Sequence, residues 1–175
     1  MILAWWFCRR FLFHLSPPPF HSWRRFLLRL FGSKVGQGVL IDPGVKIIFP
    51  WYFSVGAHTW IADEVLVNSA DLVTIGDNCV LSPRVNVGGG KHRIDLPTFD
   101  PLPEPTVIGS GVWLATDVFV NGGVTIGDNV VVGARSSVFK DLPANTVCIG
   151  TPAKPVRERR FFDIDREQED AAAPG

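Results

Sequence analysis

The stretch "IGSGVWLATDVFVNGGVTIGDNVVVGARSSV", residues 108–138, repeats a pattern every six residues. Each sixth position is aliphatic, and these positions are Ile108, Leu114, Val120, Ile126, Val132 and Val138. A unit of this length is too short for a repeat of two helices, but it suits a short strand followed by a corner. The stretch therefore predicts strands that turn a corner every six residues and point the aliphatic side chain inward.

The same frame runs through the preceding part of the chain. Its aliphatic triplets are Val35, Ile41 and Ile47; Val55, Ile61 and Val67; and Ile75, Leu81 and Val87. A glycine follows the first member of each triplet, at Gly36, Gly56, Gly76, Gly109 and Gly127. Because Gly, Asn and Asp tolerate the positive φ of tight corners, the pattern predicts an all-β prism of about five triangular coils. A β-sandwich of short strands is the alternative, and it does not account for fifteen regular matches.

One segment interrupts the repeat. Twenty-one positions separate Val87 from Ile108, where six would suffice, so residues 88–107 form a loop that carries an insert. Three glycines open it, Lys91 and His92 follow, and prolines stiffen the rest. These prolines are Pro97, Pro101, Pro103 and Pro105. The sequence predicts an arm that leaves the prism and can reach a neighbouring subunit.

Composition limits the possible functions. With 175 residues and 46% apolar content, the chain can bury one substantial core, which we place at residues 32–150, between extensions 1–31 and 151–175. Seventeen basic and seventeen acidic residues leave no net charge, which gives no support to nucleic-acid binding. Three widely spaced cysteines indicate neither disulfides nor a metal site. The apolar opening "MILAWWF" is too short to span a bilayer and has no cleavage site, so we expect a cytoplasmic protein.

The V-G-x-x-V and I-G-D-N-x-V units resemble those of the hexapeptide-repeat acyltransferases. The chain is most similar to the colanic acid biosynthesis type of O-acetyltransferase, through "FPWYFSVGAHTWIAD", "LVNSADLVTIGDN", "IGTPAKPVRER" and the insert, over roughly residues 23–160. The resemblance implies a left-handed parallel β-helix and a homotrimer with active sites between subunits. It also implies acetyl transfer from acetyl-CoA to a hydroxyl of a sugar or exopolysaccharide precursor.

The histidine of the insert is the candidate catalytic residue. The resemblance assigns His92 as general base, and an imidazole with a pKa of about 6.5 suits the removal of a hydroxyl proton near neutral pH. The transfer is then direct, without an acyl-enzyme. We expect backbone N–H groups at Ala115 and Thr116 to stabilise the oxyanion. Alternatively, His92 is only an exposed polar residue of the loop.

Further residues are assigned through the same resemblance. Those expected along the acetyl-CoA groove are Trp113, Ala115, Thr116, Ala134, Lys140 and Arg157. Trp113 is alternatively a corner-packing aromatic residue, and Phe139 stands where relatives commonly have a small polar residue, which alters the expected groove.

On the acceptor side, Asn68 and Asp71 lie one coil before His92, although both residue types also form turns. We expect Asp95 either to contact the acceptor or to orient His92.

Two other functions are possible for a prism of this kind. A non-catalytic scaffold would predict neither the insert nor its histidine. A γ-type carbonic anhydrase needs three histidine ligands, whereas His58 and His92 are the only histidines of the repeat region, and His58 falls at a structural corner. Acetyl transfer without a metal is therefore the preferred function.

The two ends differ in character from the repeat. Residues 1–31 mix aromatic side chains with arginines, and Pro17–Pro19 limit them to two short helices. This composition suits a membrane surface or a lipid-linked oligosaccharide acceptor, but equally a cap over the open end of the prism. The polar tail "DREQEDAAAPG", residues 165–175, is expected to be disordered.

Overall fold

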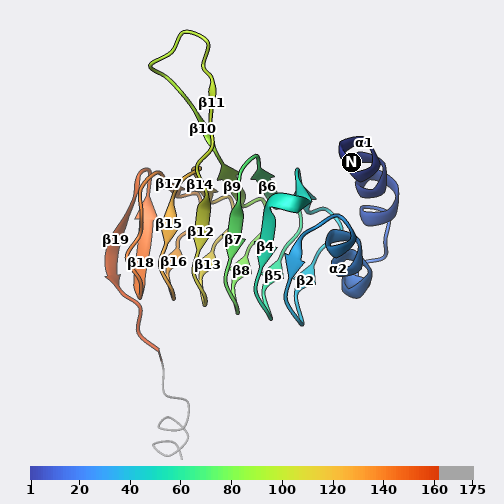
Figure 1. Ribbon diagram of the computed structural model, residues 1–175. Helices are drawn as coiled ribbons and strands as arrows, with labels where there is room; N and C mark the ends of the chain where they lie inside the picture. Colours follow the sequence, from blue (N-terminus) through green and yellow to red (C-terminus); the bar gives the residue numbers. More distant parts are fainter. Residues whose placement is uncertain (162–175) are drawn as a thin grey trace, which may run out of the picture.

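The computed structural model describes residues 1–161, so the tail predicted to be disordered lies outside the described residues. Short parallel strands stack into three sheets that run the length of a prism (Figure 1). Sheet 1 contains β1 (Lys34–Val35), β4 (Phe53–Val55), β7 (Val73–Ile75), β12 (Thr106–Ile108) and β15 (Thr125–Ile126). Sheet 2 contains β2 (Leu40–Ile41), β5 (Trp60–Ile61), β8 (Val80–Leu81), β13 (Trp113–Leu114), β16 (Val131–Val132), β18 (Thr146–Gly150) and β19 (Ala153–Glu158). Sheet 3 contains β3 (Lys46–Ile47), β6 (Leu66–Ser69), β9 (Asn86–Gly89), β14 (Phe119–Val120) and β17 (Ser137–Val138).

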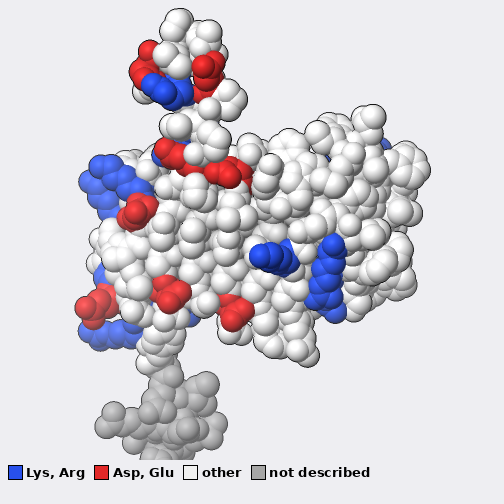
Figure 2. Space-filling view, viewed as in Figure 1, with Lys and Arg blue, Asp and Glu red and all other residues white. Residues whose placement is uncertain are grey.

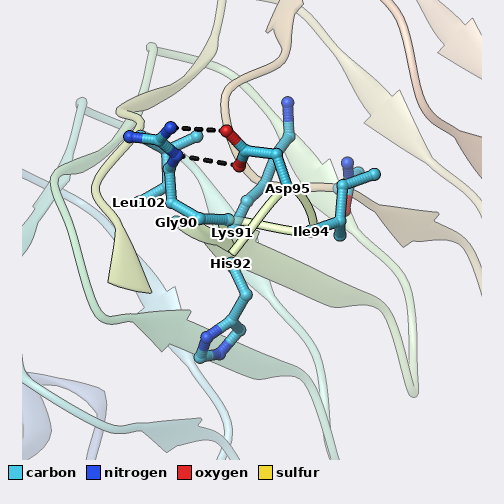
Figure 3. Close-up of a pocket in the computed structure, with 8 residues that line it drawn as sticks. Gly90, Lys91, His92, Ile94, Asp95 and Leu102 are labelled. Atoms are coloured by element: carbon cyan, nitrogen blue, oxygen red, sulfur yellow. Dashed lines mark hydrogen bonds and ion pairs between the residues drawn. The ribbon is translucent and has the colours of Figure 1, made fainter. Parts of the chain in front are cut away.

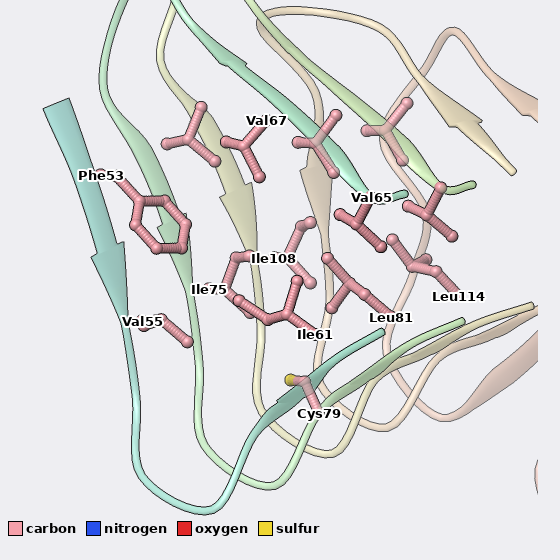
Figure 4. Packing of buried hydrophobic residues seen from close by; sticks show 14 of the residues in the cluster. Phe53, Val55, Ile61, Val65, Val67, Ile75, Cys79, Leu81, Ile108 and Leu114 are labelled. Atoms are coloured by element: carbon pink, nitrogen blue, oxygen red, sulfur yellow. The ribbon is translucent and has the colours of Figure 1, made fainter. Parts of the chain in front are cut away.

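The aliphatic repeat positions form the core, which confirms the predicted parallel β-helix. Along sheet 2 they stand in register from coil to coil, as Ile41, Ile61, Leu81, Leu114 and Val132, and all five side chains are fully buried. Figure 4 shows this packing, with side chains from all three sheets meeting inside the prism.

The predicted number of coils was one too low. After Val138 the frame slips by two residues and continues at Leu142 and Cys148, which are both buried. Leu142 bridges in parallel to Ile126, and β18 extends sheet 2, so a sixth, incomplete turn follows the five full coils. This turn is hard to see in the sequence, because the frame slips before it and a cysteine takes the place of an aliphatic residue. At its end, β19 pairs antiparallel with β18 and closes the prism.

The insert forms the predicted arm. Its stem consists of β10 (Lys91–His92) and β11 (Pro101–Leu102), which pair antiparallel and project from the side of the prism (Figure 1). The arm leaves at the end of β9 and returns into β12, so it stands at the corner between sheets 3 and 1.

The N-terminal segment covers the first coil. It contains α1 (Ile2–Cys8), the π-helical turn η1 (Arg9–Phe13) and α2 (His21–Leu30), and a short 3-10 turn, η2 (Pro50–Tyr52), follows β3. In the strands, N–H groups of one coil donate to carbonyl oxygens of the next, as from Leu40 to Thr59. No coil precedes the first one, so the carbonyl oxygens of Val35, Val39, Ile41 and Ile47 face its open end and need donors, and the N–H of Ile41 faces the same way.

Side chains of the segment supply those donors. They are Trp5 Nε1 to Ile47 O at 2.9 Å, Arg24 Nε to Ile41 O at 2.6 Å, Arg25 to Val39 O at 2.7 Å and Arg29 to Val35 O at 2.6 Å. Arginine and the tryptophan indole donate hydrogen bonds without accepting them, which suits these carbonyl oxygens. The N–H of Ile41 at the same edge donates to His21 Nδ1 at 3.2 Å. Residues 1–31 were expected to form either a cap or a membrane-binding surface, and these contacts show that the inner face of the segment is a cap. Over residues 1–161, no helix combines the length and the apolar character needed to cross a bilayer.

Candidate functional site

His92 lies on the exposed side of the arm's stem, between two hollows. One, of about 570 Å³, is lined by Gly90, Lys91, His92, Arg93, Ile94, Asp95, Leu102 and Asn121. The other, of about 290 Å³, shares the stem residues and adds Asn68, Ala70, Gly89, Pro101 and Pro103. The imidazole therefore borders space on both sides, toward the preceding coil at Asn68 and toward the following coil at Asn121.

A backbone carbonyl determines the tautomer of His92. Its Nδ1 lies 2.6 Å from the carbonyl oxygen of Phe99, which can only accept a hydrogen bond. Nδ1 therefore carries the proton, and Nε2 presents a lone pair, which is the form that a general base requires. Phe99 was not recognised from the sequence, since its contribution is a backbone atom seven residues away across the arm.

The expectation that Asp95 orients His92 is not met. Asp95 Oδ1 accepts a hydrogen bond from Arg93 Nε at 2.9 Å, and its other oxygen pairs with the same guanidinium. Figure 3 shows this bidentate pair, with the ring of His92 pointing away from it. The hydrogen bond from Arg93 lowers the pKa of the Asp95 carboxyl. The spacing in the sequence explains the result. Arg93 and Asp95 are two residues apart in the arm, so their side chains meet each other and Asp95 does not reach the imidazole of His92. A contact from Asp95 to the acceptor remains a prediction.

The stem is fastened to the prism by charge and by close backbone packing. Lys91 Nζ lies 2.6 Å from Glu104 Oε2, which joins β10 to the segment just after β11. A Cβ added at Gly122 would lie 2.7 Å from the backbone nitrogen of Gly90. Only glycine fits there, and the run "NGG" at residues 121–123 is the sequence signal for this approach.

The two predicted acceptor residues have different surroundings. Asn68 lines the smaller hollow beside His92, and its strand pairs it with Gly88. Asp71 instead accepts a hydrogen bond from the N–H of Leu72 at 2.7 Å, the turn-forming role that its residue type allows. The sequence analysis missed Asn121, which lines the larger hollow from the next coil.

The residues predicted for acetyl-CoA lie elsewhere on the prism. Trp113 is 47% exposed on sheet 2, and its Nε1 donates to Ser82 Oγ at 3.0 Å. Ala115, Thr116 and Ala134 follow at the corner between sheets 2 and 3, and Arg157 is exposed on β19 at the end of sheet 2. Five of the six thus share one side of the prism.

Lys140 is the exception, because it follows β17 at the corner from which the arm leaves. That corner is opposite sheet 2 in a three-sided prism, so a single chain does not bring His92 together with Trp113 or Thr116. The predicted oxyanion donors also differ from each other. The N–H of Ala115 donates to Val132 O at 3.0 Å, whereas that of Thr116 has no acceptor within residues 1–161.

The part of the chain that the structure describes contains no candidate metal site. Among the described residues, no three His, Cys, Asp or Glu side chains gather closely enough to hold a metal ion.

Comparisons with known proteins agree with this architecture. A family described as "Bacterial transferase hexapeptide (six repeats)" matches residues 105–140. The chain is 49% identical over 158 residues to the putative colanic acid biosynthesis acetyltransferase WcaF of Escherichia coli K12, covering 90% of this chain and 87% of that protein. It is 34% identical over 155 residues to the galactoside O-acetyltransferase of the same organism, covering 83% and 73%.

Solved structures give the same result. A hexapeptide-repeat acetyltransferase from Vibrio cholerae, complexed with acetyl coenzyme A, superposes with a TM-score of 0.77 at 30% identity, covering 87% of this chain and 84% of that one. A galactoside acetyltransferase in complex with coenzyme A superposes with a TM-score of 0.79 at 30% identity, covering 91% and 80%. The repeat, the arm and these similarities together establish that the chain belongs to the hexapeptide-repeat acetyltransferases.

Proposed function

We propose that the protein moves an acetyl group from acetyl-CoA directly to a hydroxyl of a sugar in an exopolysaccharide precursor, with His92 as general base. The observation that carries the proposal is the hydrogen bond from His92 Nδ1 to Phe99, which leaves Nε2 free beside two hollows. The relatives support the acceptor class, since they are named for colanic acid biosynthesis and for galactosides. The structures solved with coenzyme A or acetyl coenzyme A support the donor.

The residues of this chain divide the reaction between them. His92 Nε2 takes the proton of the acceptor hydroxyl while the oxygen forms its bond to the thioester carbonyl carbon. The N–H of Thr116 donates to the carbonyl oxygen as negative charge develops there. The imidazolium of His92 then returns the proton to the sulfur when the carbon–sulfur bond breaks. Asn68 and Asn121 border the base and hold the sugar by hydrogen bonds.

A homotrimer would complete this site, because His92 and Thr116 lie on opposite sides of one chain. The outward positions of sheet 2 are apolar and in register from coil to coil: Leu40, Trp60, Val80, Trp113, Val131 and Val147. The corresponding positions of sheet 1 are mostly polar: Lys34, Ser54, Thr74, Val107 and Thr125. A continuous apolar row favours burial against a second subunit, whose arm would bring His92 to Trp113.

Mixed trimers test this shared site. His92→Ala and Trp113→Ala chains, each impaired alone, are unfolded together and refolded as a mixture. If each site uses both chains, every mixed trimer regains one intact site, and about a quarter of wild-type activity returns by random assembly around a threefold axis. No recovery in trimers shown to be mixed would place both residues in a site within one chain.

The reaction itself is tested by thiol release from acetyl-CoA with a panel of nucleotide sugars and lipid-linked oligosaccharides. Acceptor-dependent release, absent from His92→Ala, is expected. A folded protein that binds acetyl-CoA but acetylates no sugar would contradict the acceptor class. A protein that does not bind acetyl-CoA would leave the scaffold function as the better account.

A cytoplasmic location follows from this donor. Acetyl-CoA is available there, and the three cysteines, Cys8, Cys79 and Cys148, are buried free thiols, which suits a reducing compartment.

A further inference from the structure

The N-terminal segment has a second, outward face that is apolar. Its inner face caps the prism, while side chains from all three of its helical elements remain 38% to 68% exposed on the other side. This apolar patch consists of Phe7, Phe11, Leu12, Leu15, Phe20, Trp23 and Phe26. A protein surface normally scatters such residues singly, so a cluster of seven indicates a contact surface.

The members of the apolar patch form one continuous surface. The rings of Phe7 and Phe11 lie 4.8 Å apart, and those of Trp23 and Phe26 stack at 5.7 Å. Between the two pairs lies a hollow of about 370 Å³, lined by Phe11, Leu12, Leu15, Ser16, Pro17, Phe20 and Trp23. The indole N–H of Trp23 donates to Leu12 O at 3.0 Å, so the exposed ring has no unsatisfied polar group to keep it in water.

The charge around the apolar patch has one sign. No acidic residue precedes Asp42 in the chain. Three of the arginines turn toward the prism, namely Arg24, Arg25 and Arg29. Arg10 is exposed, and Arg9 is half-buried. The guanidinium of Arg9 lies 5.3 Å from the ring centroid of Trp6. Figure 2 shows no acidic side chain at this end of the molecule. The cations complement an anionic partner.

We propose that the apolar patch docks on a membrane surface that contains anionic lipids. Aromatic rings settle at the boundary between headgroups and acyl chains, and the guanidinium groups of Arg9 and Arg10 meet lipid phosphates. A second copy of the chain fits less well, because pairing the patch with itself would bring arginines together without an acidic partner. The segment lies at one end of the prism and the arm projects from its side, so docking leaves His92 accessible (Figure 1).

Vesicle co-sedimentation tests the docking, using phosphatidylcholine vesicles with and without phosphatidylglycerol. The wild type should sediment with the anionic vesicles. Phe7→Ser with Phe26→Ser should weaken this binding at least about tenfold, because it removes two rings that the membrane would bury. Arg9→Gln with Arg10→Gln should weaken it about tenfold, on the anionic vesicles only. Phe161→Ser removes a ring of similar exposure, 63%, near the C-terminal end of the described chain and should change nothing.

Two results would overturn the proposal. One is vesicle binding that both double variants leave unchanged, or that is absent from the wild type. The other is a smaller assembly of the Phe7 and Phe26 variant in lipid-free buffer, seen by light scattering, because the patch would then join copies of the chain. Acetyl transfer is not part of the measurement, so these results are independent of the proposed reaction.

Discussion

At the scale of single residues, the hydrogen bond from His92 to Phe99 decides which imidazole nitrogen can act as a base. The carbonyl oxygen accepts from Nδ1 at 2.6 Å and leaves the lone pair on Nε2. A carboxylate in this place would also stabilise the imidazolium, but the residue predicted for that role, Asp95, is held by Arg93. The proposed base, His92, is therefore oriented by a backbone carbonyl and not by an acidic side chain.

Substitution of the base separates chemistry from folding. His92→Ala should lower acetyl transfer by at least about 10²-fold, the usual contribution of a general base. The proposed trimer and the thermal unfolding temperature should be the same as in the wild type, because the side chain is exposed. Steady-state kinetics and light scattering measure the two effects, and near-normal turnover would remove His92 from the mechanism.

Asp95 provides a contrasting prediction. Because its carboxylate pairs with Arg93, Asp95→Asn should change the turnover number less than about threefold, within the range of an exposed ion pair. The pH profile of turnover should keep its wild-type midpoint. A shifted midpoint would show that Asp95 acts on His92 after all, in a conformation that forms with substrate.

Lys140 and Arg157, the two cations predicted along the acetyl-CoA groove, should contact its phosphates and so affect binding rather than turnover. Lys140→Ala and Arg157→Ala should each raise the KM for acetyl-CoA about tenfold, the loss expected for one charge-assisted hydrogen bond, with little change in kcat. Phosphates are bound alike in the ground and transition states. An unchanged KM in both variants would mean that acetyl-CoA runs along another side of the prism.

At the scale of elements, the arm is useful only while its stem keeps a fixed position. The backbone of Gly90 lies so close to Gly122 that a Cβ there would fall 2.7 Å from the Gly90 nitrogen. The salt bridge from Lys91 to Glu104 ties β10 to the chain that returns from β11 to the prism. Position, and not only the presence of a histidine, is what the insert contributes.

Gly122→Ala tests this dependence. The new methyl group must push the stem outward, and a displacement of about 1 Å at a catalytic group can lower the rate by about 10²-fold. We expect a loss of turnover with the same assembly state as the wild type. Gly133→Ala is the matched control, since its Cβ would meet chiefly the movable side chain of Ile149. Equal losses in both variants would indicate general damage to the prism.

At the scale of the whole molecule, the backbone groups that the first coil leaves without a neighbouring coil determine what can close that end. Carbonyl oxygens of the first coil face the N-terminal segment, and the buried side chain of Arg24 donates to one of them, Ile41 O, and to Pro17 O of the segment itself. Burial lowers the pKa of Arg24, which is the cost of placing a cation there. The segment is thus part of the fold, and its deletion should expose the first coil and cause aggregation.

Arg24→Met measures this cap. The substitution keeps much of the side-chain volume but leaves buried acceptors without donors, each costing about 1–3 kcal/mol of unfolding free energy. Denaturant unfolding should show the loss, whereas Arg10→Met, at an exposed position, should be neutral. Equal stability of the two variants would contradict the capping role.

The cap should also make stability depend on pH through His14. Burial lowers the pKa of His14, and Arg9, Arg10 and Lys46 act in the same direction. In the unfolded chain the pKa is about 6.5, so below that pH the unfolded state binds a proton first and the unfolding free energy falls. Thermal unfolding between pH 7.5 and pH 5 should show this loss, and His14→Gln should reduce it. An identical pH dependence in the variant would assign the loss to other groups.

Much of the fold follows from the sequence, because its determinants are local. An inward aliphatic residue every six positions and an asparagine at a left-handed corner, such as Asn78 or Asn129, act within one coil, so they are legible along the chain. The repeated glycines are legible too, but they are required by the backbone of the next coil, as Ala57 shows beside Gly36. The insert and its histidine stand out as a break in that period. The sixth turn was missed because its frame slips just before Leu142.

Only the tertiary structure decided the features that join distant parts of the chain. The partner of His92 is a backbone carbonyl, which no residue type announces, and Asn121 reaches the site because coils stack. The arginines of residues 1–31 fit a cap or a membrane equally well until the contacts show that Arg24, Arg25 and Arg29 donate to carbonyl oxygens of the first coil. The sequence by itself determined the coil and the candidate base, because these depend on neighbours in the chain. The cap, the orientation of the base and the distance between His92 and Thr116 depend on which atoms three-dimensional packing brings together.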